Sequence, residues 1–173
     1  ESALITAAAS GIGHLAVQLA RVRGAARVVG AVSDLEKAEF VRGLGADEAV
    51  EYSAATWGEP VDYALDAVGG DLLTPALAAV QPGGRLVAYG SGGGAVEAFD
   101  LLSGAKSVTG FQIARAAAET PEQYEQWRQE LWQYYAAGQV QPSVFAQFSL
   151  EDAAEAHAVI EDRGNLGKVV LVP

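Results

Sequence analysis

The chain has 173 residues, half of them hydrophobic, and 22 acidic against 11 basic residues give it a formal net charge of -11. This length supports one well-buried core rather than two complete domains, and the negative charge repels nucleic acid and anionic membrane surfaces, so an anionic ligand requires a local basic cluster. Cysteine is absent, which excludes disulfides and thiolate metal sites and favours a cytoplasmic protein.

Short runs rich in β-branched residues alternate with helical patterns along most of the chain. The predicted strands are ALITAAA (3–9), RVVGAVS (27–33), EAVEY (48–52), VDYALDAV (61–68), RLVAYGS (85–91) and SVTGFQI (107–113). Helices are predicted over 12–23, ended by Gly24, and over 35–43, behind a Ser33–Asp34 cap. Strand, helix and strand in units of about 30 residues predict an α/β fold with a doubly wound parallel sheet.

A longer helix follows these units. Thr120, Pro121 and Gln123 form a capping-box start with proline at the first helical position, which predicts a helix that ends at Gly138. Apolar residues recur along it at helical spacing: Tyr124, Trp127, Leu131 and Tyr134. Such a stripe is typical of packing, so we predict a core or subunit contact rather than a cofactor site.

Residues 139–173 fall outside the alternating pattern. A last helix is predicted over 150–163, capped by Ser149 and with His157 on its apolar face, and the strand KVVLV (168–172) ends the chain. We therefore divide the chain into a doubly wound domain at 1–138 and a C-terminal segment at 139–173. That segment either packs on the first domain or completes a different one.

The stretch LITAAASGIGHLAVQLA (4–20) has the form of a strand that turns into a helix around a dinucleotide phosphate. The usual fingerprint is G-x-G-x-x-G, and with Gly13 as its last glycine the first two positions hold Ala8 and Ser10. Alanine fits the first position if its φ stays negative. Serine at the second position keeps the backbone somewhat farther from the pyrophosphate but adds a hydroxyl donor. Gly11 and Gly13 leave the helix N-terminus open to phosphate. A plain strand-to-helix turn built of small residues would have the same pattern.

Five motifs spread along the chain are shared with one enzyme superfamily. They are AAASGIGHLAVQLA (7–20), VSDLEKAEFVRGLGADEAVEYS (32–53), LDAVGG (65–70), VQPGGRLVAYG (80–90) and SLEDAAEAHAVIEDRGNLGKVVLVP (149–173). The chain thereby resembles the cofactor domain of the medium-chain dehydrogenase/reductase superfamily, in its zinc-independent quinone oxidoreductase (zeta-crystallin-like) branch. The resemblance implies a Rossmann fold with strand order 3-2-1-4-5-6 and an NADP-binding domain at 1–138. It also implies that the C-terminal helix and strand return to a GroES-like catalytic domain that this sequence lacks, so we expect an excised domain, a split protein or a synthase module.

In that branch the Ala-x-Ser-x-x-Gly turn is an accepted variant, so the resemblance implies that NADPH is bound. Its 2'-phosphate would be clamped by Ser33, Lys37, Tyr52 and Arg163. The full set of implied cofactor contacts is Ala8, Ser10, Gly11, Ile12, Gly13, Ser33, Lys37, Tyr52, Asp66, Val68, Gly69, Gly90, Ser91 and Arg163. Each of them also has an ordinary structural interpretation. Asp34 is a helix cap or, turned inward, an acid that binds the ribose of the cofactor.

The resemblance implies hydride transfer from NADPH to a quinone or an activated C=C bond. Alternatives are an enoyl-reductase module of a polyketide or fatty-acid synthase and a nucleotide-binding domain without turnover. No catalytic residue or metal site is assigned, because His14 and His157 lack partners at metal or triad spacing and are predicted to be structural. The family implies a homodimer through an edge strand at 106–113. Nucleic acid is not an expected partner, because the net charge of -11 repels it. A membrane is not expected either, since no apolar run reaches the roughly 20 residues of a membrane helix.

Overall fold

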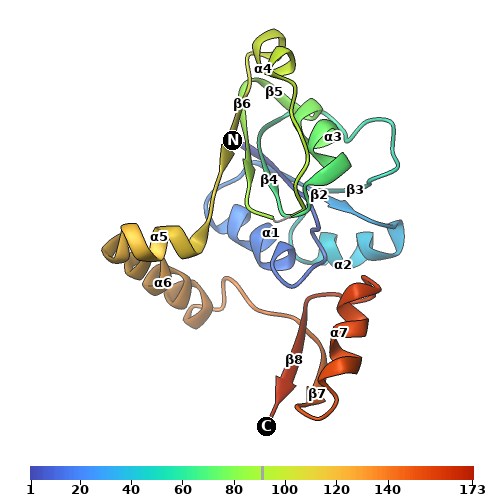
Figure 1. Ribbon diagram of the computed structural model, residues 1–173, viewed down its shortest axis with the longest axis vertical. Coiled ribbons are helices and arrows are strands. Elements are labelled where there is room, and N and C mark those ends of the chain that lie inside the picture. Colours follow the sequence, from blue (N-terminus) through green and yellow to red (C-terminus); the bar gives the residue numbers. More distant parts are fainter. Residues whose placement is uncertain (91) are drawn as a thin grey trace.

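The computed structural model describes residues 1–90 and 92–173, and its main feature is a six-stranded parallel sheet (Figure 1). The strands are β1 (Ser2–Ile5), β2 (Arg27–Val32), β3 (Glu48–Glu51), β4 (Val61–Asp66), β5 (Val80–Ala88) and β6 (Ser107–Gly110). Their order is β3-β2-β1-β4-β5-β6, and every neighbouring pair is parallel. The predicted α/β class and strand order are therefore confirmed.

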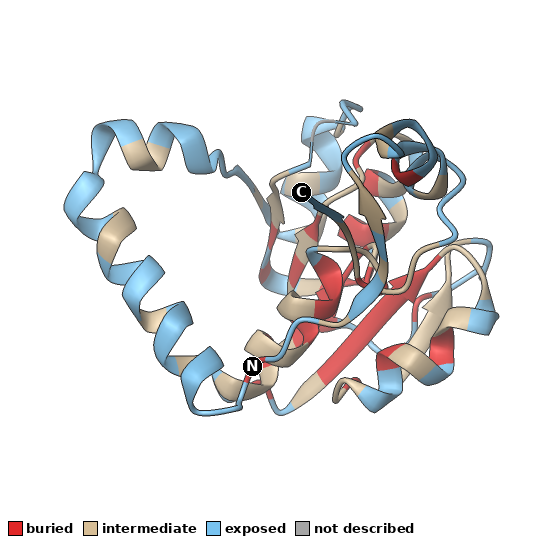
Figure 2. Cartoon of the chain, turned by 90° about the horizontal axis from the view of Figure 1, so that it is seen from below, coloured by how far each residue is buried: buried red, intermediate tan, exposed pale blue. Residues whose placement is uncertain are grey.

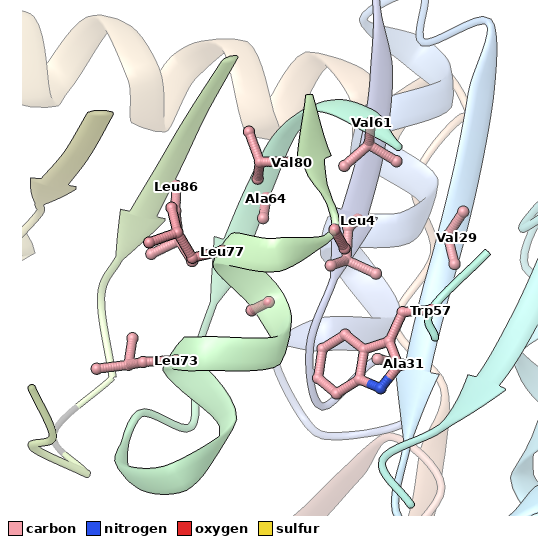
Figure 3. Packing of buried hydrophobic residues seen from close by; sticks show 12 residues of the cluster. Leu4, Val29, Ala31, Trp57, Val61, Ala64, Leu73, Leu77, Val80 and Leu86 are labelled. Atoms are coloured by element: carbon pink, nitrogen blue, oxygen red, sulfur yellow. The ribbon is translucent and has the colours of Figure 1, made fainter. Parts of the chain in front are cut away.

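Helices cover both faces of this sheet. They are α1 (Gly13–Val22), α2 (Ala38–Gly43), α3 (Leu73–Ala78) and α4 (Ala98–Gly104), with short 3-10 turns at Leu35–Lys37 and Gly70–Leu72. Consecutive side chains of a strand point to opposite faces, so Ile5 and Val28 join the core beneath α1 and α2. Leu4 and Val29 join the core beneath α3, which Figure 3 shows. Burial on both faces explains why these strands read as continuous apolar runs.

Several element boundaries differ from the prediction. β1 ends at Ile5 rather than at residue 9, because Ala7 adopts a left-handed φ of +48° and starts the turn into α1. β5 begins at Val80 rather than at residue 85, through an irregular register opposite Val61 and Tyr63. Helices α3, α4 and α5 (Ile113–Glu119) were not predicted. They are short, and tertiary packing rather than a long periodic pattern defines such helices.

The helix α6 (Pro121–Ala136) forms an arm with α5 that projects from the body, and Figure 2 shows only exposed and intermediate residues along it. None of its residues is buried, and Trp127 and Leu131 are 36% and 48% exposed. The aromatic stripe is therefore not a core contact within the described residues, and the subunit contact stays a prediction. The predicted capping box is wrong, since the Thr120 hydroxyl donates to the Ala116 carbonyl of α5 at 2.9 Å instead of capping α6.

The C-terminal segment has a two-stranded sheet of its own, in which β7 (Val144–Ser149) and β8 (Lys168–Val172) pair in parallel and α7 (Ala153–Glu161) connects them, while its division from 1–138 as a domain stays a prediction. The helix begins three residues later than predicted, and it packs through Ala156 while Leu150 and Ile160 are 54% and 51% exposed. The predicted apolar face, which included the exposed His157, is therefore wrong. Periodicity marks an apolar face, but the side of α7 that is covered is the one that carries Ala156, where the helix meets β7 and β8.

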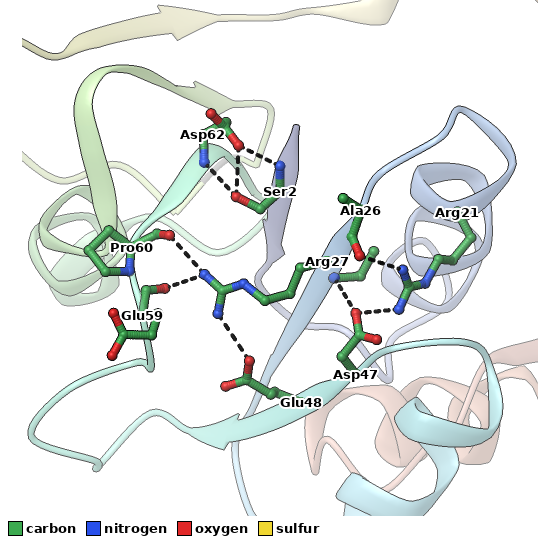
Figure 4. Close-up of polar contacts among 10 residues, drawn as sticks. Ser2, Arg21, Ala26, Arg27, Asp47, Glu48, Glu59, Pro60 and Asp62 are labelled. Carbon is green, nitrogen blue, oxygen red and sulfur yellow. Dashed lines mark hydrogen bonds and ion pairs between the residues drawn. The ribbon is translucent and has the colours of Figure 1, made fainter.

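Polar contacts tie the amino ends of the strands together (Figure 4). Asp62 of β4 accepts hydrogen bonds from the Ser2 amide at 2.6 Å and the Ser2 hydroxyl at 2.8 Å. Arg27 of β2 donates to Glu48 of β3 at 3.0 Å and to two backbone oxygens before β4. The opposite, carboxyl edge of the sheet is left for a ligand, as in other doubly wound folds. Among the described residues, no helix is long and apolar enough to span a membrane.

Candidate functional site

A cleft of about 650 Å³ lies at the carboxyl ends of the central strands. It is lined by Ala7, Ala9, Ser10, Gly11, Ile12, Val32, Ser33, Lys37, Tyr52, Ala67, Val68, Gly92, Ile160, Arg163, Asn165, Gly167, Lys168 and Val169. The strand order reverses between β1 and β4, which is where doubly wound sheets hold their ligands. Of the predicted contacts, Ala8, Gly13, Asp66, Gly69 and Gly90 do not line the cleft. Ser91 falls outside the described residues.

The turn between β1 and α1 is shaped by steric contacts. Ala8 is fully buried, and its amide donates to the Ala31 carbonyl at 3.1 Å. A Cβ added to Gly13 would lie 1.9 Å from the Ala7 oxygen, so only glycine lets the helix approach the strand this closely. This is the packing role of the third fingerprint glycine. Ala8 can replace the first glycine because its small side chain is buried and the left-handed φ of the turn occurs at Ala7 instead.

Ser10 uses its side chain on the turn itself. Its Oγ accepts a hydrogen bond from the Gly13 amide at 3.0 Å. This satisfies one of the free N–H groups at the start of α1 that a phosphate would otherwise take. Ser10 thus caps the turn as an acceptor, and its hydroxyl proton remains as the donor predicted from the sequence.

The second wall of the cleft comes from residues that the prediction missed. A Cβ on Gly11 would lie 3.3 Å from Lys168 Cδ and 3.6 Å from its Nζ, so the lysine side chain crosses the turn. Gly167, with a φ of +93°, donates its amide to the Ala9 carbonyl at 2.8 Å. Asn165 Nδ2 donates to the Gly167 oxygen at 2.8 Å. The Asn-x-Gly-Lys run before the last strand is the signal that could have indicated this wall.

His14 joins the turn to the C-terminal segment. Its Nε2 lies 3.0 Å from the Ser143 amide, and its Nδ1 lies 2.9 Å from the Ser10 carbonyl. Since an amide can only donate, Nε2 is unprotonated and Nδ1 carries the proton. Burial lowers the pKa of His14, and the nearby Lys168 charge adds to this. The ring is fully buried and neutral, and the structural role predicted for it is confirmed.

A cluster of polar groups lies at the end of β2. Lys37 Nζ donates to Ser33 Oγ and to the Arg163 carbonyl, both at 2.7 Å, and lies 3.1 Å from Asp34 Oδ2. The fold thus brings Arg163 next to Ser33 and Lys37, and the clamp of a 2'-phosphate by these side chains stays a prediction. These residues border a second hollow of about 530 Å³ beside the cleft. The Arg163 guanidinium takes part in neither of these hydrogen bonds. Arg163 lines both the main cleft and the second hollow.

Asp34 does not act as the predicted helix cap. It stands at the position before the 3-10 turn, but its side chain makes no capping bond. Its carboxylate instead accepts from Ser33 Oγ at 2.9 Å and pairs with Lys37. The Ser33 hydrogen bond and the Lys37 ammonium hold the pKa of Asp34 below its usual value. A side-chain partner one turn away has replaced the backbone amides that a cap would use.

Tyr52 connects this cluster to the turn. Its hydroxyl accepts from the Ala7 amide at 2.9 Å, and its ring packs 5.9 Å from that of Trp57. Burial raises the pKa of Tyr52, so the phenol is neutral and keeps a proton to donate into the cleft. Tyr89, which the prediction did not include, has a buried hydroxyl without a hydrogen-bond partner among the described residues. Burial, with Asp66 as a lesser cause, raises the pKa of Tyr89 to about 12.

The loops after β4 and β5 form the remaining part of the site. Asp66 is only 1% exposed, and its carboxylate accepts from the Thr6 hydroxyl and the Gly69 amide, both at 2.8 Å. It orders the turn from beneath the cleft, while the neighbouring Val68 lines it. A Cβ on Gly90 would lie 2.0 Å from the Ala67 oxygen. Gly90 therefore allows the two loops to pack against each other.

Comparisons with known proteins agree with this geometry. A family model described as zinc-binding dehydrogenase matches residues 44–171. The chain belongs to this family. The description refers to zinc, but the described residues contain no group of three or more His, Cys, Asp or Glu that could hold a metal ion. They do not fit a zinc site within this chain.

Three relatives of this family member cover nearly all of its length. It is 33% identical to a 2-haloacrylate reductase from a Burkholderia species over 183 residues, which span 98% of this chain and 55% of the relative. The crystal structure of Escherichia coli quinone oxidoreductase complexed with NADPH matches at a TM-score of 0.87 and 28% identity, with 100% of this chain and 57% of that chain covered. The crystal structure of the CurK enoyl reductase matches at a TM-score of 0.84 and 27% identity, with 99% of this chain and 55% of that chain covered. The chain thus spans little more than half the length of these proteins.

Proposed function

We propose that this chain is the NADPH-binding domain of an oxidoreductase that transfers hydride to a quinone or to an activated C=C bond. The observation that carries the proposal is the meeting of three cations, Lys37, Arg163 and Lys168, at one cleft of a chain with net charge -11. A dinucleotide with a 2'-phosphate carries two anionic groups, the pyrophosphate and the 2'-phosphate. We place the first beside Lys168 and the second beside Lys37 and Arg163. NADPH supplies the hydride when it is bound, and the chain holds and orients it.

The pyrophosphate fits the turn into α1. The amides of Gly11 and Ile12, just before that helix, have no hydrogen-bond partner among the described residues, and the helix N-terminus favours an anion. The Lys168 side chain lies over Gly11. The 2'-phosphate fits the hollow at Lys37 and Arg163, where each charge-assisted hydrogen bond contributes about 1.5–3 kcal/mol when well formed. Tyr52 lines the neighbouring cleft, which shares Ser33, Lys37 and Arg163 with this hollow, and we propose that its hydroxyl proton completes the clamp from that side. The nicotinamide then extends toward Val68 and Gly92, and no residue of this chain is assigned to the chemical step.

The reaction class is proposed from the relatives, whose names describe reduction of quinones, of 2-haloacrylate and of an enoyl group. All of these acceptors can take a hydride. The CurK match favours one second candidate, an enoyl-reductase module of a synthase. A nucleotide-binding domain without turnover is the third candidate, because an acceptor must also be positioned, and positioning can contribute several kcal/mol of the barrier. We propose a cytoplasmic setting on the absence of cysteine.

Two exposed surfaces support a larger assembly. On the β7–β8 unit, Val144 and Phe145 are 49% and 46% exposed, which supports 139–173 as part of a further domain. At the sheet edge, β6 pairs with β5 alone among the described strands, and Phe111 beyond it is 41% exposed. An uncovered edge strand is prone to pair with another chain. We propose that 106–113 pairs with a second copy, and a monomer in light scattering at high concentration would count against this dimer.

Calorimetric titration of the chain with NADPH and NADH tests the nucleotide assignment. Wild type is expected to bind NADPH more tightly, and Arg163→Ala to weaken NADPH about tenfold or more while NADH is unchanged. Arg115→Ala is the matched control, because Arg115 is exposed on α5 and pairs only with Glu119 among the described residues. Equal binding of the two nucleotides by wild type would refute the 2'-phosphate site. Quinone and enone turnover by the whole protein then distinguishes the reductase from the domain without turnover.

A further inference from the structure

The Lys37 ammonium is surrounded by three oxygen atoms, two of which accept hydrogen bonds from it while the third belongs to an ion pair. An ammonium group donates three hydrogen bonds, and Lys37 Nζ has three oxygen partners, Ser33 Oγ, the Arg163 carbonyl and Asp34 Oδ2, at 2.7, 2.7 and 3.1 Å. Its side chain is only 14% exposed, so water has little access to it. A 2'-phosphate that binds here must therefore replace one of these partners.

Asp34 is the partner that resembles a phosphate. Its carboxylate is an anion that accepts a hydrogen bond from the Ser33 hydroxyl at 2.9 Å and forms an ion pair with Lys37 at 3.1 Å. Ser33 and Lys37 are two of the donors that the proposed function gives to the 2'-phosphate. The Asp34 side chain is 43% exposed and lines the hollow next to Arg163, so it can rotate toward solvent. The Arg163 carbonyl belongs to the backbone and cannot be displaced in this way.

We infer that the Asp34 carboxylate occupies the donors of the 2'-phosphate and competes with it, which makes Asp34 the residue that limits the preference of this chain for NADPH. The inference rests on the proposed function. Two anions cannot share the same hydroxyl and ammonium without repulsion, so binding of the phosphate must break the Asp34 pairs. NADH carries a neutral hydroxyl at this position and has no such conflict.

A neighbouring acid provides the matched comparison. Glu36 lines the same hollow and is exposed, and it forms no hydrogen bond or ion pair within the described part of the chain. Glu36→Gln removes the same charge from the same region as Asp34→Asn does. The difference between the two variants therefore isolates direct competition from a general effect of negative charge.

The test is calorimetric titration of wild type, Asp34→Asn and Glu36→Gln with NADPH and NADH, with Asp34→Ala as a second variant and thermal unfolding as a check of folding. Asp34→Asn and Asp34→Ala are expected to tighten NADPH binding about fivefold or more, the scale of one adjacent charge at a half-exposed site, and to leave NADH binding unchanged. Glu36→Gln is expected to change NADPH binding much less.

The inference is overturned if the Asp34 variants fail to tighten NADPH binding, or if Glu36→Gln tightens it equally. Loss of NADH affinity alone would also overturn it and would assign Asp34 to the ribose hydroxyls. A wild-type chain that binds neither nucleotide would refute the proposed function itself, and the inference with it.

Discussion

His14 Nε2 accepts a hydrogen bond from the Ser143 amide at 3.0 Å, across 129 residues of sequence. The same ring donates from Nδ1 to the Ser10 carbonyl at 2.9 Å. One neutral imidazole thus joins the turn before α1 to the residue that directly precedes β7 in the C-terminal segment. Ser143 in turn accepts from the Lys168 amide at 2.8 Å, so the position of Lys168 over the turn depends on this contact.

The His14 contact predicts a pH dependence of stability. Burial lowers the pKa of His14 below the usual 6.5 in the folded chain, so the unfolded chain binds a proton there at a higher pH than the folded chain does. The contribution of the neutral ring is therefore fully present above pH 6.5 and is lost as the pH falls through the lower, folded-state pKa. Urea unfolding from pH 8 to pH 5 should show wild type losing more stability than His14→Gln does.

The two histidines separate this effect from general acid destabilisation. At pH 8, His14→Gln is expected to be less stable than wild type by about 1–3 kcal/mol, since the glutamine amide does not reproduce the ring geometry that serves the Ser143 amide and the Ser10 carbonyl together. His157→Gln serves as the control, because His157 is exposed, and its curve should follow wild type. A His14→Gln curve parallel to that of wild type over the whole pH range would show that the ring does not titrate as described.

Lys168→Ala should weaken both nucleotides. Lys168 crosses Gly11, where the pyrophosphate of either NADPH or NADH would lie. Loss of one charge-assisted hydrogen bond predicts about a tenfold or greater loss of affinity for each nucleotide, with their ratio kept. Titration calorimetry measures both, and Arg115→Ala is again the control. A loss confined to NADPH would move Lys168 to the 2'-phosphate site.

Gly13→Ala should destabilise the chain by about 3 kcal/mol or more, because the new Cβ would lie 1.9 Å from the Ala7 oxygen and force backbone shifts. Gly43→Ala is the matched control at the end of α2. A Cβ there meets nothing within 4 Å, so this variant should be as stable as wild type or more stable by up to about 1 kcal/mol. Urea unfolding compares the two, and equal stability would show that the turn can open without cost.

Tyr89→Phe and Tyr52→Phe should have opposite effects. The Tyr89 hydroxyl is buried without a partner among the described residues, and its removal is expected to stabilise the chain by about 1 kcal/mol. The Tyr52 hydroxyl accepts from the Ala7 amide, so its removal should cost about 1–3 kcal/mol. Thermal unfolding of both variants checks this, and destabilisation by Tyr89→Phe would mean that its hydroxyl has a bound partner.

The residue pattern alone determined the α/β class and the turn into α1, whereas the strand order came from the resemblance. Apolar runs such as VVGAV indicate strands that are buried on both faces, and Gly13 indicates that helix and strand approach each other closely. These signals are local, because periodicity and steric demands act over a few residues. The resemblance added Lys37, Tyr52 and Arg163, whose meeting no local pattern predicts.

Only the tertiary structure decided which side chains are partners. Asp34 has the sequence context of a cap, yet it pairs with Lys37, since an ammonium one turn away competes with backbone amides. Lys168 and His14 gained their places from contacts between segments far apart in the chain. The stripe on α6 has the spacing of a core face but stays exposed. Periodicity indicates that one face of a helix is apolar. Which part of the protein covers that face depends on long-range packing, and the amino-acid pattern of one segment does not predict this.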